Sequence, residues 1–253
     1  MLLALALPGR ATEAAPSASP FVPGERLTYQ VSWSIFPAGE VTATLEQVPD
    51  RAGDSYEVQT TARSRGFVSL LFNLNDSFRS IFDPQTLCSR RIEKRINEGH
   101  RHKQTEIVFD GVRQLAVLDE RDLAKPGHPD KHAENAIPPC VEDIISAFYY
   151  LRRQPLRVGD EIRFPVNDGA KTHRVVVEVQ ARELVRSPLG NRFAFRVEPK
   201  VFGDLYKKKG RMLIWFSDDS QRLPLRIKAM MLIGDISGTL QSVSTAPPSS
   251  TPP

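Results

Sequence analysis

The sequence predicts an all-β fold: one large, curved antiparallel sheet or two tandem half-barrels made by internal duplication, with one amphipathic connecting helix. Apolar and polar residues alternate along about fourteen short segments, which is typical of strands with one buried face. The stretch from Pro23 to Val31 is similar to the stretch from Val158 to Val166. Between positions 20 and 99, eleven residues are identical to the residue 135 positions further along the chain. Such a repeat indicates one β-rich unit used twice.

Composition divides the chain into a folded region and two ends. Both ends are rich in Ala, Ser, Thr and Pro and carry too little apolar surface to offset chain entropy. We expect a remnant signal segment and flexible linker at 1–20, a single β-rich domain at 21–243 and a disordered tail at 244–253. The domain would consist of two similar halves, about 21–118 and 156–243, joined by a loop and helix at 119–155.

The first half is predicted to be an antiparallel meander. Leu27, Tyr29, Val31 and Trp33 share one face of the first strand, with polar residues between them. Further strands are expected at 41–48, 56–60, 78–82, 90–96, 104–109 and 114–118, with a short helical turn at 67–74.

Between the halves, residues 119–138 are rich in proline and charge and predict a long exposed loop. Apolar residues then recur at spacings of three and four between Val141 and Arg153, which predicts an amphipathic helix that ends before Pro155. Glu142 and Asp143 would lie in its first turn, where the helix dipole favours acids. We expect this helix to cover an open end of the sheet.

The second half resumes with strands and has no intervening helix, which favours an all-β class. The expected strands are 161–166, 171–179, 193–197, 211–216, 223–231 and 235–243. A strongly curved sheet of this size leaves a concave apolar interior, where ligand cavities of β proteins lie.

The first residues indicate export. Leu2 to Leu7 and the small residues that follow are similar to the end of a secretory signal without its basic start, so we expect the true start codon to lie upstream of Met1. The alternative is a cytoplasmic protein with an apolar N-terminus. No other segment has the roughly 20 apolar residues that cross a bilayer, so we expect a protein that does not span a membrane. Cys88 and Cys140 could form a disulfide in an exported protein or remain two buried thiols.

Charge argues against a nucleic-acid partner. The net charge of +4 comes from Lys and Arg spread along the chain, and the one dense run, at 207–211, predicts a hairpin turn. Nucleic-acid binding needs basic residues interleaved with exposed aromatics on one face. Weak attraction to anionic lipid headgroups or polysaccharide suits an envelope protein better.

The sequence contains no convergent catalytic or metal-binding set. Asp218 and Asp219 could be the paired acids of a glycoside hydrolase, but neighbouring strand residues point to opposite faces, and this segment favours a turn. The four-residue spacing of His128 and His132 suits a metal only on a helix, which Pro129 disfavours, and neither a Gly-x-Ser-x-Gly motif nor a phosphate loop is present. We expect no enzyme activity, no metal and no cofactor.

Aromatic residues supply the candidate binding site. Tyr29, Trp33, Phe148, Tyr149 and Trp215 either pack in the core or line a cavity between the sheet and the helix. Arg152, near the end of the helix, could receive an anionic headgroup or could complement the helix dipole.

Several short motifs follow one another in a fixed order along the chain. They are Phe-x-Pro-Gly-Glu-x-Leu-x-Tyr at Phe21 to Tyr29, Ala38-Gly39, Asp76-Ser77-Phe78 with Phe82-Asp83, Asp143 to Arg152 with Pro155-Leu156 and Gly159, Gly190, Trp215 to Asp219, Leu223-Pro224 and Gly234. Because these motifs occur in this order, the chain resembles a bacterial exported family, domain of unknown function 3108, over about residues 21–243. The resemblance implies a cell-envelope location and a β-rich fold, and it implies no activity or catalytic residues.

We therefore expect a periplasmic, non-enzymatic β protein that binds a lipid or lipid-linked glycan, or that assists envelope assembly. Its partner would be an amphiphilic small molecule or an envelope glycolipid, and a protein partner is left open. The alternatives are a glycan hydrolase that uses Asp218 and Asp219, and a protein-interaction module that pairs through exposed strand edges.

Overall fold

A computed structural model describes residues 19–50, 53–71, 73–201, 210–231 and 234–245. The expected signal segment, most of the tail and the basic residues 207–209 lie outside these ranges. The described chain forms one antiparallel sheet of 14 strands and two short helices, so the all-β prediction is confirmed.

The first eight strands and both helices follow in chain order. They are β1 (Glu25–Trp33), β2 (Phe36–Asp50), β3 (Gly53–Ser64), α1 (Phe67–Leu71), β4 (Asn75–Phe82), β5 (Ser89–Glu98), β6 (Arg101–Asp110), β7 (Leu115–Asp122), β8 (Lys131–Ala136) and α2 (Ser146–Arg153). The remaining strands are β9 (Glu161–Asn167), β10 (Thr172–Ser187), β11 (Gly190–Val201), β12 (Arg211–Ser217), β13 (Pro224–Met231) and β14 (Gly234–Thr245).

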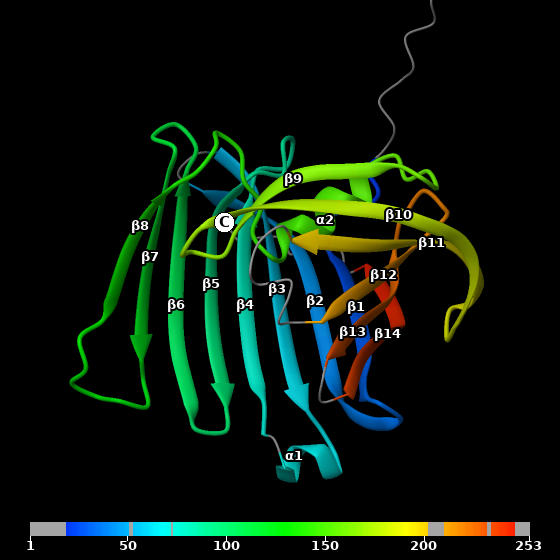
Figure 1. Ribbon diagram of the computed structural model, residues 1–253, viewed down its shortest axis with the longest axis horizontal. Helices are drawn as coiled ribbons and strands as arrows, with labels where there is room; N and C mark the ends of the chain where they lie inside the picture. Colours follow the sequence, from blue (N-terminus) through cyan, green and yellow to red (C-terminus); the bar gives the residue numbers. More distant parts are fainter. Residues whose placement is uncertain (1–18, 51–52, 72, 202–209, 232–233, 246–253) are drawn as a thin grey trace, which may run out of the picture.

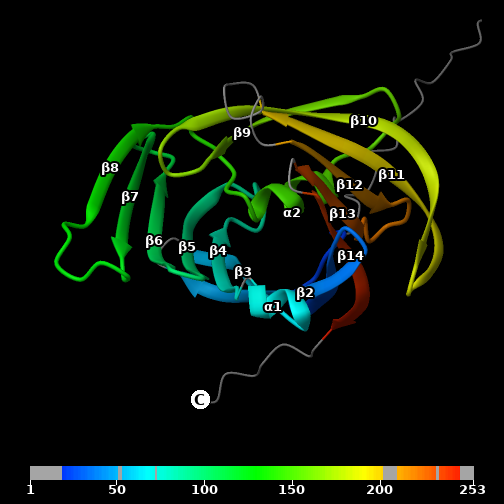
Figure 2. The ribbon, with the colours of Figure 1, turned by 60° about the horizontal axis from the view of Figure 1, so that its bottom comes forward.

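The first and last strands join the two halves of the sheet. β1 pairs with β14 from Glu25 opposite Thr245 to Trp33 opposite Ile236, and a meander extends outward from each of them. The strand order therefore runs from β8 through β1 and β14 to β9, and the sheet is continuous. It curls around α2 without closing, with β8 and β9 as its edges (Figures 1 and 2).

Six strands of the first half recur in the second at a nearly constant spacing. The starts of β1 to β6 precede those of β9 to β14 by between 133 residues (Arg101 to Gly234) and 137 residues (Gly53 to Gly190). Left-handed backbone positions repeat at the spacing of 135 found in the sequence: Gly24 with Gly159, Ser34 with Gly169, Leu87 with Arg222, and Gly99 with Gly234. Because three of these residues, Ser34, Leu87 and Arg222, are neither Gly nor Asn, the turn geometry is retained even where the residue is unfavourable. In the described part of the second half, β7, β8 and α2 have no counterpart.

The region between the halves differs from the prediction in two ways. The expected loop at 119–138 contains β8 and the end of β7, and β8 is held by pairing from Glu120 opposite Lys131 to Leu115 opposite Ala136. Its sequence, Lys-His-Ala-Glu-Asn-Ala, has no β-branched or aromatic residue, so pairing overrides propensity. Helix α2 begins at Ser146, five residues later than expected.

Polar contacts connect the two sheet edges. Asn167 Nδ2 donates to Asn135 Oδ1 at 2.7 Å, and Asn135 Nδ2 donates to the Gly169 carbonyl at 3.0 Å. Glu142 forms an isolated parallel bridge with Val166 of β9. The β9 edge is therefore partly occupied by the protein's own chain.

Helix α2 fills the interior of the curved sheet and contacts both halves. Tyr149 packs with Val58 and Phe82 of the first half, whereas Leu151 packs with Phe164 and Phe216 of the second. Figure 2 shows the helix inside the curve of the strands. The core is thus a sheet wrapped around one helix.

A disulfide fixes the segment that leads into α2. Cys88, just before β5, is bonded to Cys140, with 5.1 Å between their Cα atoms. Next to it, the Ser89 N–H donates to the Val141 carbonyl at 2.9 Å. This crosslink holds the approach to the helix against the first half of the sheet.

A buried carboxylate fixes the start of the helix. Asp143 Oδ2 accepts hydrogen bonds from Ser80 Oγ at 2.6 Å and Ser89 Oγ at 2.8 Å. Its Oδ1 accepts the backbone N–H groups of Ile145 at 2.6 Å and Ser146 at 3.1 Å. Burial raises the pKa of Asp143, although these hydrogen bonds act to lower it.

The neighbouring Glu142 is also buried. Ser146 Oγ donates to Glu142 Oε2 at 2.5 Å, and burial raises the pKa of Glu142 to about 8, with a further contribution from Asp143. Glu142 is therefore mostly protonated in the folded protein at neutral pH, whereas in the unfolded chain it ionises near its ordinary value of 4.5. Folding then binds a proton between these two pH values.

We predict that this proton uptake lowers the free energy of unfolding as pH rises from about 4.5 to about 8. Glu142→Gln keeps a neutral side chain and should escape the decline. Its stability relative to wild type should increase between pH 5 and 8 by an amount on the order of 3 kcal/mol, because each unit of pKa difference corresponds to about 1.4 kcal/mol. Urea unfolding at several pH values measures this, with Glu46→Gln on the exposed surface as control. A pH-independent difference would contradict it.

Candidate ligand-binding cavity

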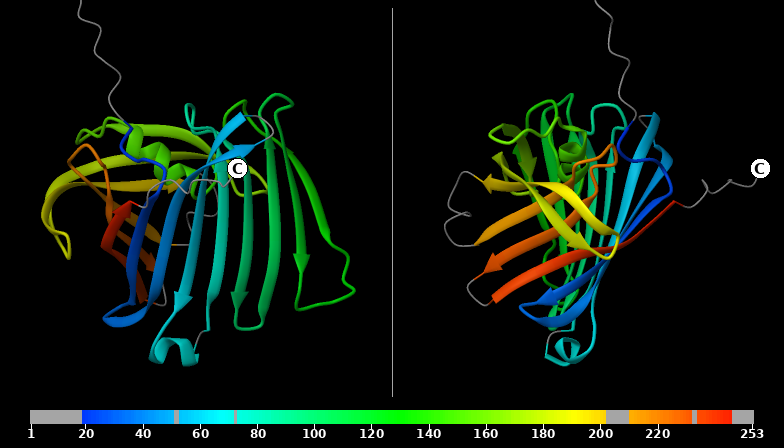
Figure 3. Two further views of the ribbon diagram at one scale, coloured as in Figure 1. Left: turned by 180° about the vertical axis from the view of Figure 1, so that it is seen from behind. Right: turned by 90° about the vertical axis from the view of Figure 1, so that its right-hand side faces the viewer.

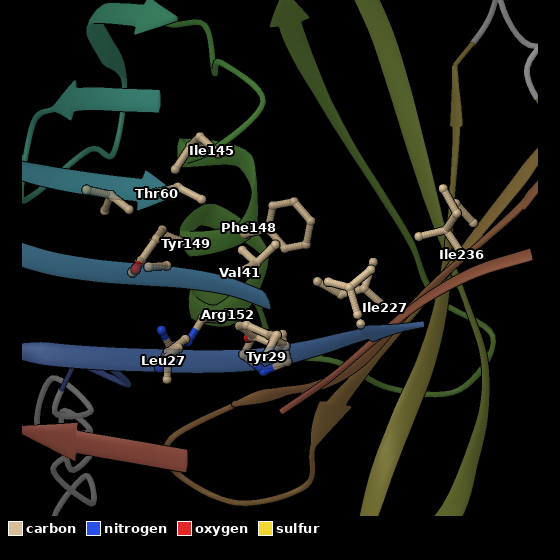
Figure 4. Close-up of a pocket in the computed structure, with 16 residues that line it drawn as sticks. Leu27, Tyr29, Val41, Thr60, Ile145, Phe148, Tyr149, Arg152, Ile227 and Ile236 are labelled. Carbon is tan, nitrogen blue, oxygen red and sulfur yellow. The ribbon is translucent and has the colours of Figure 1, made fainter. Parts of the chain in front are cut away.

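A cavity of about 330 Å³ lies between α2 and the strands around the β1–β14 junction. Side chains from β1, β2, β3, β13, β14 and the α2 region line it, and nearly all are apolar (Figure 4). The lining residues are Leu27, Tyr29, Val31, Val41, Ala43, Val58, Thr60, Ile145, Phe148, Tyr149, Arg152, Pro224, Ile227, Ala229, Ile236 and Gly238.

Strand register explains why this space is empty. Val31 lies opposite both Gly39 and Gly238, and Gly238 lies opposite Ile227. Leu27 lies opposite Ala43. Gly238 and Ala43 therefore line the interior where larger residues would fill it, so a cavity is left.

The cavity is closed at one end and open at the other. Leu27, Val58 and Tyr149 are at most 4% exposed, whereas Ile236 is 37% exposed. Ile236 lies opposite Trp33 at the end of β1. The mouth therefore faces the end of the sheet that carries α1 and the β1–β2 turn, which we call the α1 end (Figure 1).

A buried ion pair forms part of the closed end. Arg152 Nη1 and Nη2 donate to the two carboxylate oxygens of Glu25 at 2.6 and 2.7 Å, and the Arg152 side chain is 1% exposed. Nη2 also donates to the carbonyls of Pro20 at 3.1 Å and Gln221 at 3.0 Å. The guanidinium lies over the ring of Phe21, 5.1 Å from its centroid. These contacts occupy Arg152 within the protein, which argues against a role for it as the receptor of an anionic headgroup.

The two tyrosines of the cavity wall are neutral. Burial raises the pKa of Tyr29 and that of Tyr149 above the ordinary value of 10, although the charge of Arg152 acts in the opposite direction. The wall therefore presents no net charge to a ligand, and its chemistry suits a hydrocarbon chain.

The structure separates the six predicted aromatic and arginine residues into two groups. Tyr29, Phe148, Tyr149 and Arg152 line the cavity together. Trp33 is half-buried near the Gly234 backbone, and Trp215 is buried with its indole Nε1 donating to Glu183 Oε1 at 2.6 Å. Neither tryptophan is among the lining residues of this cavity, which favours core packing, the other reading of the sequence.

Asp218 and Asp219 lie in the β12–β13 turn rather than in the cavity. Asp219 Oδ1 accepts the backbone N–H groups of Gln221 and Arg222 at 3.0 and 3.2 Å, and Asp218 Oδ2 accepts from Arg182 at 2.6 Å. Asp83 makes the same turn contacts to Gln85 and Thr86 in the first half. Both acids therefore act in turn structure, which argues against the hydrolase hypothesis.

Sequence reasoning missed most of the aliphatic wall, including Val41, Ile145, Ile227, Ala229 and Gly238. Their strands were predicted, but a cavity depends on which small residues face each other across the sheet. The available signal was Gly238, a glycine in the interior of a predicted strand, which marks a weak packing position.

Within the described ranges, no group of three or more His, Cys, Asp or Glu side chains could hold a metal ion. None of the helices among those residues has the length and apolar character needed to cross a bilayer.

The open curved sheet, its internal helix and its apolar cavity define a β-barrel-like protein with a helix-filled interior. The family model "Protein of unknown function (DUF3108)" matches residues 28–241, and the chain belongs to this family. The resemblance seen in the sequence motifs is thereby confirmed.

One solved structure shows a similar fold at low identity. The β-barrel-like protein of domain of unknown function DUF1849 from Brucella abortus matches with a TM-score of 0.59 and 9% identity, over 89% of this chain and 99% of that chain. A candidate exported protein with a YmcC-like fold from Bacteroides fragilis NCTC 9343 matches with a TM-score of 0.38 and 9% identity, over 89% and 98%. A search of curated proteins found no match.

We predict that Arg152 and Glu25 are strongly coupled, because each buried charge would be destabilising without the opposite charge beside it. Arg152→Met or Glu25→Met alone leaves a buried charge unpaired and should cost about 3 to 5 kcal/mol in free energy of unfolding. The double variant should cost much less than the sum of the two, as measured by urea denaturation. Additive costs would contradict a direct coupling between the side chains.

Proposed function

We propose that this protein is an exported, non-enzymatic envelope protein that binds the hydrocarbon part of a lipid or lipid-linked glycan. The observation that carries the proposal is the apolar cavity beside α2, which is within the size range of small-molecule sites. Protein interiors are normally close-packed, so an apolar space of about 330 Å³ is an unusual feature to retain without a ligand.

The direction of the cavity supports an amphiphile in particular. Its deep end is enclosed by Leu27, Val58 and Tyr149, and its mouth lies beside Ile236. A hydrocarbon chain would enter with its apolar end first, while its polar headgroup would remain in the solvent. This arrangement needs no charged receptor inside the cavity.

The disulfide supports a location outside the cytoplasm. Structural disulfides persist in oxidising compartments such as the bacterial periplasm and are rare in the reducing cytosol. The Cys88–Cys140 bond holds the approach to α2, so it contributes to the structure that forms the cavity. A periplasmic location is consistent with both the disulfide and the cavity that it helps to form.

The placement of the acidic residues supports a binding role over hydrolysis. Glu142 and Asp143 are at most 2% exposed and hydrogen-bonded to serines, and Asp218 and Asp219 stabilise a turn. A glycoside hydrolase needs two carboxyl groups that reach the substrate.

We predict that filling the cavity abolishes binding without harming the fold. A Cβ added at Gly238 would meet only Tyr29 Cδ1, at 4.0 Å, so Gly238→Leu should be accommodated and should occupy the cavity. Its affinity for the fluorescent fatty acid cis-parinaric acid should fall at least about tenfold, as measured by fluorescence titration.

Gly238→Ala is the matched control because it adds only one methyl group and should bind almost as well as wild type. Thermal unfolding should show that both variants are folded. Equal saturable binding by wild type and Gly238→Leu, or no binding by wild type, would refute a hydrocarbon site in this cavity.

A further inference from the structure

Large apolar side chains are exposed on three separate connections at the α1 end. Ile35 in the β1–β2 turn is 85% exposed, and Phe36 at the start of β2 is 59% exposed. Phe67 at the start of α1 is 70% exposed, and Leu123 after β7 is 50% exposed. In an antiparallel meander the chain reaches the same end after β1, β3 and β7, and Figures 1 and 3 show these connections spread along one end of the sheet.

These residues occupy positions where polar residues or glycine are usual. The β1–β2 connection has only Ser34 and Ile35 between the strands, with Ser34 at φ 55°. Two-residue hairpin loops favour Asn, Asp and Gly, which satisfy the turn and face water without cost. An isoleucine there, followed by a phenylalanine, gains nothing from the fold and points to contact with something outside it.

The β1–β2 turn and the α1 connection lie beside the mouth of the cavity. Trp33 immediately precedes the β1–β2 turn and lies opposite Ile236, the exposed residue of the cavity lining. The Arg65 N–H donates to the Ala38 carbonyl at 2.8 Å, which places the start of the α1 connection beside the β1–β2 hairpin. A surface that contacts these side chains would also face the opening.

Cationic side chains accompany the apolar ones. Arg65 lies two residues before Phe67 and is 64% exposed in its side chain, and Arg101 in the β5–β6 hairpin is 60% exposed. Lys125 is exposed two residues after Leu123. Arg65 and Arg101 pair with Glu40 and Glu98, but the whole chain carries a net charge of +4. The positive net charge of the whole chain is complementary to anionic lipid headgroups.

We propose that the α1 end docks on an anionic lipid bilayer, with Ile35, Phe36, Phe67 and Leu123 inserted at the interface and the cavity mouth facing the membrane. Side chains on separate turns suit a fluid interface, which can surround each one. A protein partner would instead require a contiguous packed core. The docking itself is independent of the cavity, and its role in lipid entry rests on the proposed function.

Vesicle co-sedimentation tests the docking. The purified full chain is mixed with vesicles of phosphatidylethanolamine and phosphatidylglycerol, and with vesicles of phosphatidylcholine alone. We expect wild type to bind the anionic vesicles more strongly. Phe36→Ser combined with Phe67→Ser should reduce the partition coefficient at least about tenfold, because two phenyl groups leave the interface.

Val112→Ser is the matched control, since Val112 is 95% exposed in the β6–β7 turn at the opposite end. It should bind vesicles as wild type does, and thermal unfolding should show that every variant is folded. Gly238→Leu should keep vesicle binding and lose fatty acid binding, so the two proposals fail separately. Equal sedimentation of wild type and the double serine variant would overturn the docking proposal. So would light scattering that shows dimers dissociated by those substitutions, which would identify a second copy as the partner.

Discussion

The fold depends on a helix held inside a sheet that does not close. Without α2, the concave face of a 14-stranded open sheet would expose its apolar side chains, and no strand pairing between β8 and β9 would shield them. The buried pair between Arg152 and Glu25 fixes the end of that helix to the start of β1, and the Gln221 carbonyl adds the β12–β13 turn. One guanidinium thus connects the first, middle and last parts of the chain. Burying charges is costly, so such a pair is retained for the geometry that it imposes.

The internal repeat explains where the cavity lies. Six strands recur with their left-handed turn positions, so the scaffold is symmetrical in outline. The β1–β14 junction occurs once, and α2 also has no counterpart. The cavity forms where these two unique features meet. Repeated turns such as those of Asp83 and Asp219 belong to the scaffold, whereas the cavity depends on α2 and the β1–β14 junction, which the repeat does not duplicate.

Local patterns in the sequence were sufficient for most of the strands but not for the site. Alternation placed Leu27 and Tyr29 on a buried face, and helical spacing placed Phe148 and Tyr149 on α2. β8 was missed because pairing with β7, not propensity, holds it. Arg152 was assigned to a ligand because its partner, Glu25, is 127 residues away and no local pattern connects them. Trp215 was a candidate for the cavity wall because alternation assigns residues to the two faces of a strand but does not show which face α2 covers. The cavity itself arises where small residues face one another across the interior. Predicting which residues face one another requires the strand register.

The composition of the cavity wall limits how a ligand can be selected. Thr60 and the two tyrosines supply the few polar atoms, and Arg152 is saturated by the protein, so few hydrogen bonds are available for a headgroup. For the proposed hydrocarbon ligand, affinity would then come from transfer of hydrocarbon out of water, at about 0.8 kcal/mol for each buried methylene. Discrimination by such a site depends on the number of methylenes that fit before the chain reaches Tyr149 and the Arg152 ion pair at the closed end. A site of this kind selects by chain length and shape, and headgroup preference would arise only outside the mouth, from the residues of the α1 end.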